Sequence, residues 1–388
     1  VIQMEDRSLN LFDYCCDRAF QWCQPLLFRL AKDEDKAALE ALLQSGKVRS
    51  VMDPVECIAN NLFELEHPSQ KKDEAARKAF LEQERFQSEN FGVWVFFPWS
   101  GELVRYPEEE DYYHLRTYRY RNLLTKEELE TLRHKRCAVI GMSVGSNVAL
   151  TLIRNGLCGA VALADLVSPN VSNIGRAEFD MRDLCTSKLD AIAKRISHID
   201  PFVEQLHLPN GLSDASLQEL EDWHPDLVCD EVDDMKSSVH IRKFCRKIRA
   251  PFVSVSDVDD RVVLEICRFD QNPSQPLYAG MVSDKKAQLL LDGKITGFAE
   301  EVYFGQSIGF HYLSEKLVSS NLEIGKTLSG IPQLGTTSVI SGGYAAAACR
   351  DILLNRKVKS GLSSLYVSLA TKRPMLLNLL VTLQASMK

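Results

Sequence analysis

The chain has 388 residues, 45% of them hydrophobic and 26% charged, which are the proportions of an ordinary globular protein with room for two or three domains. Its net charge of −7 argues against a nucleic-acid-binding scaffold and against a polybasic membrane binder. No apolar stretch approaches the roughly 20 residues that span a bilayer. We therefore expect a protein that contacts neither nucleic acid nor membranes.

The eleven cysteines are scattered along the chain, and no two of them form a C-x-x-C pair. An odd number without regular spacing does not indicate a disulfide framework. Free thiols in a reducing compartment are the simpler interpretation, and no zinc site of the usual spacing is present. We expect a cytoplasmic protein that binds no zinc.

Residues 1–114 are predicted to form a mostly helical module with one β-hairpin. The segment "EDKAALEALLQSG" has apolar residues at helical spacing and ends on glycine. The segment "NFGVWVFFPWSGELVRY" (90–106) is rich in β-branched and aromatic residues around a "WSGE" turn, which predicts the hairpin. A helix then follows at "TKEELETLRHK", where Thr125 and Glu128 have the spacing of a capping box.

From residue 136 the pattern changes to alternating strands and helices. Near-continuous apolar strands separated by helices are typical of an α/β fold with a doubly wound, mainly parallel, Rossmann-like sheet. The helix at 337–355 is rich in small residues and is expected to pack closely against the sheet, and residues 361–388 are predicted to form a helical tail. The predicted strands are 137–141, 160–165, 226–231, 251–258 and 262–270.

The segment "CAVIGMSVGSNVALTLIRNG" (137–156) predicts a strand, a glycine turn and the start of a helix. Gly141 and Gly145 permit a tight turn, and Ser146 opens the helix. Such a turn presents backbone N–H groups and a positive helix end to a phosphate. One glycine of the dinucleotide fingerprint is absent, so the turn alone does not distinguish a nucleotide site from a well-packed connection.

Asp165 ends the next predicted strand, where a ribose hydroxyl of NAD or ATP would arrive, although a helix cap or a loop carboxylate is an alternative. Arg176 of "SNIGR" and Lys188 follow it. A triphosphate needs two such cations, because it carries about four negative charges and its leaving pyrophosphate must be stabilised. Asn173 is suited to bind a phosphate or the attacking group. A single loop cation is usually only solvated, but this clustering favours a triphosphate.

Two acids, Asp233 and Asp234, follow the strand at 226–231. At the carboxyl end of a parallel sheet, such acids face the ligand crevice. Asp233 is a candidate Mg²⁺ ligand, because that ion prefers hard oxygen donors. The alternative is that either acid stabilises a helix N-terminus.

The order of these motifs resembles that of the ThiF-type adenylyltransferases, which share a fold with ubiquitin-activating enzymes. The glycine turn, "AD", "SNIGR", a lysine, "HIDP" and "CDEVDD" follow one another as the corresponding motifs do in that family. The resemblance covers about residues 115–355 and implies a ThiF-like adenylation domain at 115–360. It implies an ATP-dependent adenylyltransferase that converts a carboxylate, such as the C-terminus of a small carrier protein or peptide, into an acyl-adenylate.

The resemblance also implies a role for each matching residue. Asp165 corresponds to the ribose-binding acid and Asp233 to the magnesium ligand. The stretch "RTYRYRN" (116–122) is similar to an arginine segment that reaches the nucleotide of the partner in dimers, so Arg119 or Arg121 is expected to act in trans in a homodimer. The residues implied to contact the nucleotide and its phosphates are Gly141, Ser143, Gly145, Ser146, Asn173, Arg176 and Lys188.

The chain departs from the family pattern at several positions. The glycine loop is one residue short, and Val167 occupies the position of a second acid. The zinc-binding C-x-x-C pairs are missing, and no cysteine matches a thioester-carrying loop. The amino-terminal segments "VMDPVECIANNLFELEHP" and "VWVFFPWSGELVRY" resemble those of a bacterial ThiF-like subgroup whose members often continue into a nitroreductase-like flavin domain. Such a domain, or a neighbouring protein of that kind, is therefore an expected partner.

Two other functions remain open at this point. An NAD(P)-dependent oxidoreductase needs only the glycine turn and Asp165, and it leaves Arg176, Lys188 and Asp233 without a purpose. A non-catalytic nucleotide-binding module would result if the altered glycine loop no longer holds a triphosphate.

Overall fold

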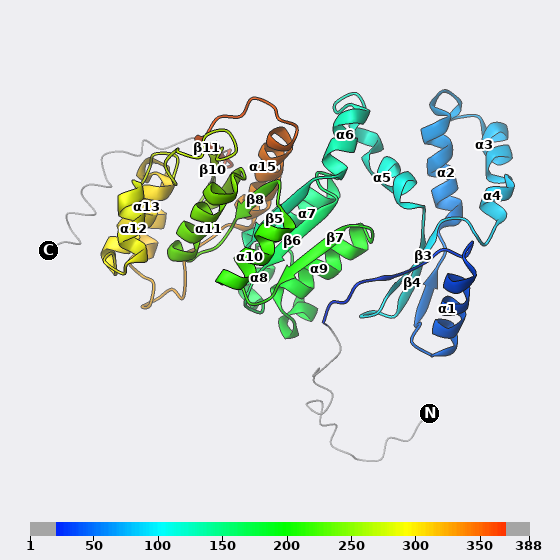
Figure 1. Cartoon of the computed structure of the whole chain (residues 1–388), viewed down its shortest axis with the longest axis horizontal. Helices are drawn as coiled ribbons and strands as arrows, with labels where there is room; N and C mark the ends of the chain where they lie inside the picture. The colour runs from blue at the N-terminus through cyan, green and yellow to red at the C-terminus, as the bar shows by residue number, and fades with distance from the viewer. Residues whose placement is uncertain (1–20, 370–388) are drawn as a thin grey trace, which may run out of the picture.

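The computed structural model describes residues 21–369 and contains two β-sheets, each covered by helices. Figure 1 shows the amino-terminal strands and helices to one side of the larger sheet. No helix within these residues has the length and apolar character needed to cross a bilayer.

The amino-terminal sheet has four strands in the order β1-β3-β4-β2. The predicted hairpin is present as the antiparallel pair β3 and β4. The sequence analysis missed β1 and β2, because strands of three residues are too short to show an alternating pattern. The elements of this part are β1 (Leu26–Phe28), α1 (Asp33–Gln44), β2 (Ser50–Met52), α2 (Val55–Glu66), α3 (Glu74–Leu81), α4 (Glu84–Gln87), β3 (Val93–Phe97) and β4 (Glu102–Tyr106).

Aromatic side chains attach the amino-terminal sheet to the rest of the chain. Tyr106 donates a hydrogen bond from its hydroxyl to the backbone oxygen of His198 (3.1 Å), and Tyr112 donates one to that of Ile199 (2.5 Å). Tyr106 also packs edge-on against Phe202. These contacts fix the amino-terminal sheet to the segment that precedes β7 (Glu204–Leu208).

Two helices, α5 (Glu109–Thr117) and α6 (Lys126–Arg133), lead into the larger sheet. The predicted capping box of α6 is confirmed. The backbone N–H of Glu128 donates to Thr125 Oγ1 (3.1 Å), and the backbone N–H of Thr125 donates to Glu128 Oε2 (2.9 Å).

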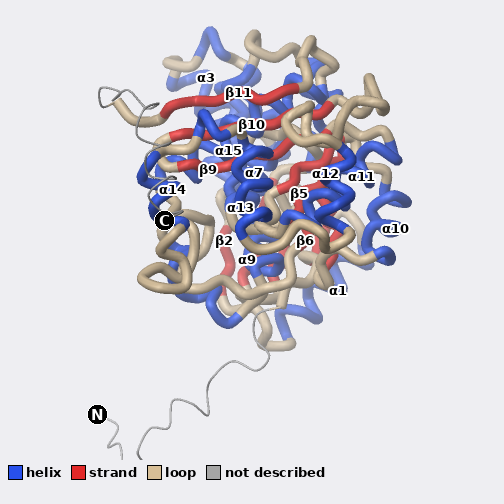
Figure 2. The backbone as a smooth tube through the Cα atoms, turned by 90° about the vertical axis from the view of Figure 1, so that its left-hand side faces the viewer, coloured by secondary structure: helices blue, strands red, loops and turns tan. Residues whose placement is uncertain are grey.

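The larger sheet has seven strands in the order β11-β10-β9-β8-β5-β6-β7. The strands from β7 to β9 are parallel, whereas β10 pairs antiparallel with both β9 and β11. Figure 2 shows β9, β10 and β11 lying side by side. The predicted doubly wound, mainly parallel fold is therefore confirmed. The strands are β5 (Arg136–Ile140), β6 (Ala160–Ala164), β7, β8 (Leu227–Asp230), β9 (Phe252–Val258), β10 (Arg261–Cys267) and β11 (Gly361–Tyr366).

Alternate residues of the central strands pack into two separate cores. On β5, Cys137 and Val139 face one core while Ala138 and Ile140 face the other. The first core is covered by α7 (Val144–Arg154), α9 (Lys188–Ile199) and α15 (Gly335–Leu353). The second is covered by α10 (Asp214–Trp223), α11 (Met235–Ile248) and α12 (Asp284–Leu291). The other helices of this part are α8 (Val171–Ile174), α13 (Phe298–Ile308) and α14 (Glu315–Asn321).

The predicted helical tail is wrong at its beginning. Residues Gly361–Tyr366 instead form the edge strand β11, which pairs antiparallel with β10. In this pairing Arg261 lies opposite Tyr366, and Ile266 lies opposite Gly361. The rest of the predicted tail, from residue 370, lies outside the described residues. The sequence analysis also missed β7, whose strand "EQLHL" is mostly half-buried and polar.

Candidate functional site

The topological switch point of the larger sheet lies between the carboxyl ends of β5 and β8, which are neighbours in the sheet. The chain continues from β5 to β6 on one side and from β8 to β9 on the other, and ligands of doubly wound sheets bind at such a point. Gly141, directly after β5, has φ +90°, and a Cβ atom there would lie 2.5 Å from the backbone oxygen of Glu231. Only glycine permits this close approach of the two strand ends.

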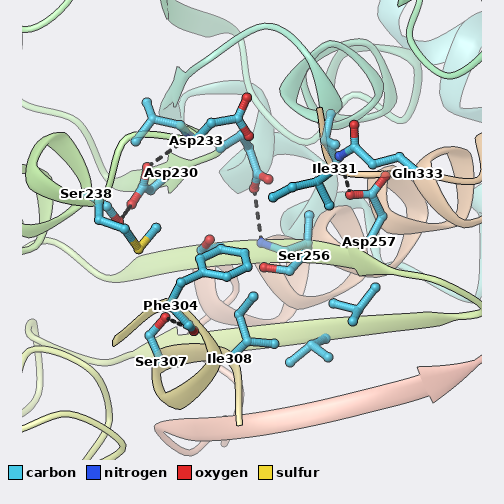
Figure 3. A pocket seen from close by; sticks show the side chains of 18 of the residues that line it. Asp230, Asp233, Ser238, Ser256, Asp257, Phe304, Ser307, Ile308, Ile331 and Gln333 are labelled. Atoms are coloured by element: carbon cyan, nitrogen blue, oxygen red, sulfur yellow. Dashed lines mark hydrogen bonds between the residues drawn. The ribbon is translucent and has the colours of Figure 1, made fainter. Parts of the chain in front are cut away.

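A cavity of about 650 Å³ opens at this point and extends along β9 and β10. Figure 3 shows its polar side, with Asp233, Asp257 and Gln333, above an apolar side with Phe304 and Ile308 of α13. Its volume is in the range of small-molecule sites.

Within the described part of the chain, the cavity lining contains five carboxyl groups and two guanidinium groups. One of the two, on Arg242, is buried and already neutralised, because it pairs with Asp230 Oδ2 (2.9 Å) and Glu265 Oε2 (2.6 Å). Its guanidinium also lies over the rings of Phe252 and Tyr278. This buried group supports the cavity wall and leaves Arg176 as the cation available to a ligand. The five acids are Asp230, Glu231, Asp233, Asp257 and Glu265.

Arg176 is held against the glycine turn. Its Nη1 donates to Ser143 Oγ (2.8 Å), and its backbone oxygen accepts from Asn147 Nδ2 (3.1 Å). Further along the chain, Gly335 at the start of α15 lies so close that a Cβ atom would be 2.2 Å from the backbone oxygen of Gly175. The loop with Arg176 is therefore positioned by α7 and α15 together.

Glu231 and Asp257 are nine-tenths buried carboxylic acids in the cavity wall. Glu231 Oε1 accepts from the backbone N–H of Val255 (3.2 Å), and Asp257 Oδ1 accepts from Gln333 Nε2 (2.8 Å). Burial raises the pKa of Glu231 well above its usual value and that of Asp257 to about 6, although Gln333 and Arg176 lower the latter. Burial therefore disfavours the charged form of both acids, although Asp257 is still mostly ionised at neutral pH.

Asp233 and Asp234 differ in environment despite being adjacent. Asp234 caps α11 by accepting from the backbone N–H of Ser237 (2.7 Å). Asp233 is exposed in the cavity and has no hydrogen bond or ion pair with any residue in the range 21–369. The helix-capping alternative therefore applies to Asp234, and Asp233 is the carboxylate that is free to meet a ligand.

Asp165 lies outside the cavity lining and ties two turns together. Its Oδ2 accepts from the backbone N–H of Met142 (2.7 Å), and its Oδ1 accepts from that of Val167 (2.9 Å). Lys188 is also buried, and its backbone N–H donates to the backbone oxygen of Val167 (3.0 Å). Among the residues described, the ammonium group of Lys188 has no hydrogen bond or ion pair. Asp165 and Lys188 therefore both contact the backbone of Val167, and neither lines the cavity.

The remaining predicted residues have mixed positions. Asn173 is buried and its Oδ1 accepts from the backbone N–H of Asn170 (2.9 Å), which caps α8. Ser146 is fully buried and accepts from the backbone N–H of Glu178 (3.1 Å). A Cβ atom on Gly145 would lie 3.2 Å from Glu231 Cβ, so this glycine admits the glutamate side chain.

Arg119 and Arg121 are exposed and do not line the cavity. The guanidinium of Arg121 lies 5.0 Å from the centre of the Tyr118 ring. Neither residue joins the other predicted site residues within this chain.

Sequence reasoning missed Glu231, Asp257 and Gln333. Glu231 lies within the "CDEVDD" segment, and Asp257 lies near the carboxyl end of β9, so the rule that selected Asp233 applies to both. Gln333 is 76 residues from Asp257 and has no such signal.

Comparison with known proteins places these observations in context. A model of the ThiF family matches residues 115–373. The uncharacterized protein MT1398 of Mycobacterium tuberculosis (strain CDC 1551 / Oshkosh) is 29% identical over 280 residues, which are 72% of this chain and 38% of the relative. A tRNA threonylcarbamoyladenosine dehydratase of Bacillus subtilis (strain 168) is 30% identical over 131 residues, which are 33% of this chain and 51% of the relative. The chain thus spans between about two fifths and one half of the length of these curated relatives.

Two solved structures are also similar. PaaA has a TM-score of 0.47 and 15% identity, covering 64% of this chain and 74% of its own. The E. coli tRNA N6-threonylcarbamoyladenosine dehydratase in complex with ATP has a TM-score of 0.45 and 16% identity, covering 62% of this chain and 95% of its own.

Proposed function

The chain belongs to the ThiF family, and we propose that it is an ATP-dependent adenylyltransferase that activates a carboxylate as an acyl-adenylate. In this reaction a carboxylate oxygen of the substrate bonds to the α-phosphorus of ATP. The bond from that phosphorus to the bridging oxygen breaks, and pyrophosphate leaves with the electron pair. No proton transfer is required, so the protein contributes positioning and charge stabilisation.

The observation that carries this proposal is the joint position of Arg176 and Asp233 in one cavity at the switch point of the sheet. The two residues come from different βα connections, and each matches a motif of the family. Ser143 holds the Arg176 guanidinium at the glycine turn, where the phosphates of a nucleotide would meet the N-terminus of α7. Lys188, buried without a partner among residues 21–369, is proposed as the second phosphate contact and Asn173 as a third.

Asp165 is proposed to accept a ribose hydroxyl. Both of its oxygens already accept backbone N–H groups, but a carboxylate oxygen can accept a second hydrogen bond. This places the nucleoside beside β6 and leaves the part of the cavity along β9 and β10 for the acyl substrate.

The donor set fits a magnesium ion. Asp233 offers a free carboxylate in the cavity, and Mg²⁺ is commonly held by one or two carboxylates together with substrate phosphates. Within the described residues, no three His, Cys, Asp or Glu side chains gather as a metal cluster, so we propose Asp233 as the protein ligand of a phosphate-bound ion. Such an ion would supply positive charge to the phosphates.

The test is a comparison of Mg-ATP binding by wild type, Asp233→Asn and Asp234→Asn, measured by isothermal titration calorimetry. We expect Asp233→Asn to weaken Mg-ATP binding at least tenfold and to have a much smaller effect without Mg²⁺. Asp234→Asn is the matched control: it removes the same charge one residue away, and asparagine is as good a helix cap as aspartate.

Other results would support the alternatives. Binding of Mg-ATP by neither wild type nor the variants would indicate a non-catalytic module. Saturable NADH binding without competition by ATP would indicate an oxidoreductase, a function that leaves Arg176 and Asp233 without a role.

The proposed acyl substrate is a small carrier protein or a peptide, and the proposed assembly is a homodimer in which Arg119 or Arg121 reaches the partner's nucleotide. Both arginines are exposed, as such a role requires. A mixture of Asp233→Asn protein and Arg119→Ala/Arg121→Ala protein should recover ATP–pyrophosphate exchange if the arginines act in trans. A nitroreductase-like flavin partner is proposed from the amino-terminal resemblance alone.

A further inference from the structure

Two carboxyl groups of the cavity each have one oxygen without a partner. Glu231 Oε2 and Asp257 Oδ2 accept no hydrogen bond, although both side chains are nine-tenths buried. Buried acceptors are almost always paired, because leaving one unpaired costs the free energy of its lost hydration. These two oxygens therefore indicate a donor that a ligand supplies.

Both carboxyl groups lie beside β9, although Glu231 itself follows β8. Glu231 reaches across to the backbone N–H of Val255, and Asp257 is two residues further along β9. Positions two residues apart on a strand are about 7 Å apart. Figure 3 shows Asp257 at the edge of the cavity beside Gln333.

Among residues 21–369, no cation pairs with either carboxyl group within 4 Å, although the charge of Arg176 lowers the pKa of Asp257 from a longer distance. Arg242 is committed to Asp230 and Glu265, and Arg176 forms a hydrogen bond with Ser143 and no ion pair within 4 Å in the described part of the chain. The cavity has an excess of carboxyl groups, and Mg-ATP would itself add negative charge. A second anion on the acyl substrate would be repelled, so the missing group is positively charged.

An organic cation fits this arrangement better than a metal ion. Glu231, Asp233 and Asp257 do not form a metal-binding group, and the same holds for any three such residues between 21 and 369. An ammonium or guanidinium group instead presents several N–H donors, and a guanidinium is wide enough to serve two acceptors. Phe304 and Ile308 form an apolar wall suited to the methylene stem that carries such a group.

We propose that Glu231 and Asp257 bind an ammonium or guanidinium group of the acyl substrate, which is therefore a carboxylic acid that carries a positive charge. This inference rests on the proposed function for the carboxylic acid and on the unpaired oxygens for the positive charge. It disfavours a carrier-protein or peptide terminus that has no cationic group near the activated carboxylate.

The experiment measures binding of agmatine, which carries a guanidinium and an ammonium at opposite ends of a methylene stem, to the protein in the presence of magnesium and a non-hydrolysable ATP analogue. N-butylurea is the neutral counterpart, in which a urea replaces the guanidinium and the ammonium is absent. We expect agmatine to bind wild type, and Glu231→Gln and Asp257→Asn each to weaken that binding at least tenfold. We expect N-butylurea to bind none of the proteins measurably.

Asp234→Asn is again the matched control, because it removes one negative charge from the same region outside the cavity lining. It should bind agmatine as wild type does. Wild type that does not bind agmatine, or binding that survives both substitutions, overturns the inference. Equal binding of the neutral counterpart does so as well.

The result is separable from the fate of the proposed function. Mg-ATP binding without agmatine binding rejects the cationic substrate and leaves adenylation intact. Agmatine binding without Mg-ATP binding rejects adenylation and leaves a cation site. Thermal melting of each variant shows that it is folded, which is expected because both substitutions keep the side-chain shape.

Discussion

Arg176 donates a hydrogen bond of 2.8 Å from Nη1 to Ser143 Oγ, and this contact joins the "SNIGR" loop to the glycine turn. The guanidinium therefore stays beside the N-terminus of α7 without a carboxylate partner within 4 Å among the described residues. Its charge remains available to an anion.

Arg176→Ala is predicted to weaken Mg-ATP binding by at least tenfold and to reduce ATP–pyrophosphate exchange by 100-fold or more, since a preorganised charge at the transition state contributes on that scale. Arg182→Ala is the control, because Arg182 is exposed and its ion pair among residues 21–369 is with Asp180. Calorimetric titration and exchange assays measure both effects. Equal losses in the two variants would contradict a specific role for Arg176.

Asp257→Asn is predicted to stabilise the protein in a manner that depends on pH. The pKa of Asp257 is about 6 in the folded state, whereas that of an unfolded Asp is about 3.9. The folded protein therefore binds the proton more tightly between about pH 4 and pH 6, so the carboxyl group costs stability that grows across this window and is complete above it. Two pKa units correspond to about 2–3 kcal/mol.

The free energy of unfolding of the variant should be about 1–2 kcal/mol higher than that of wild type at pH 7.5. This gain is smaller than about 2–3 kcal/mol because the amide nitrogen of the asparagine is left without a partner. The gain should shrink toward pH 4.5. Asparagine keeps an oxygen for the hydrogen bond from Gln333. Urea unfolding at several pH values measures the difference. A gain that does not change with pH would show that the charge is not its cause.

Gly342 and Gly343 offer a matched pair within α15. A Cβ atom on Gly342 would lie 2.6 Å from the backbone oxygen of Asn147 in α7, so Gly342→Ala must push the two helices apart and should cost about 1–3 kcal/mol. Gly343 is exposed with no atom within 4 Å, and Gly343→Ala should gain up to about 1 kcal/mol from helix propensity. Urea unfolding of both variants checks the opposite signs.

Arg116→Ala is predicted to destabilise the chain by about 3 kcal/mol or more. Arg116 Nη2 pairs with Asp200 Oδ2 at 2.6 Å, and its Nη1 donates to the backbone oxygen of Ile153 at the end of α7. Burial raises the pKa of Asp200 even with this partner present, so removing the arginine leaves a buried, uncompensated carboxylate.

Adding Asp200→Asn to Arg116→Ala should recover part of the loss, because the remaining buried group is then neutral. Arg119→Ala should change the free energy of unfolding by less than about 0.5 kcal/mol, since Arg119 is exposed. A stable Arg116→Ala protein would show that the pair does not fix α5 to the larger sheet.

The sequence was sufficient for the parallel part of the fold, and the reason lies in burial. Strands β6 and β8 are fully buried, and β5 is buried from Cys137 onward, so these strands contain continuous apolar runs that end at Gly141, Asp165 and the "DEVDD" acids. Strands β7 and β11 are the two edges of the sheet, and their polar or small residues lack this pattern.

The candidate site was predictable in part for a similar reason. Arg176 and Asp233 follow directly from their places after parallel strands, and the structure places both in one cavity. Gln333 contacts Asp257 because the chain returns to β9 more than sixty residues after the end of β10. Local sequence patterns do not encode such a return. Burial of Glu231 depends on the absence of a side chain at Gly145, which is a relation between two segments rather than a motif.

The contact of Gly335 with the backbone of Gly175 leaves no space between the chain that carries the Arg176 guanidinium and the chain that carries Gln333. Neither stretch can move toward the other, so the positions of the Arg176 guanidinium and of the Gln333 amide depend on the same backbone contact.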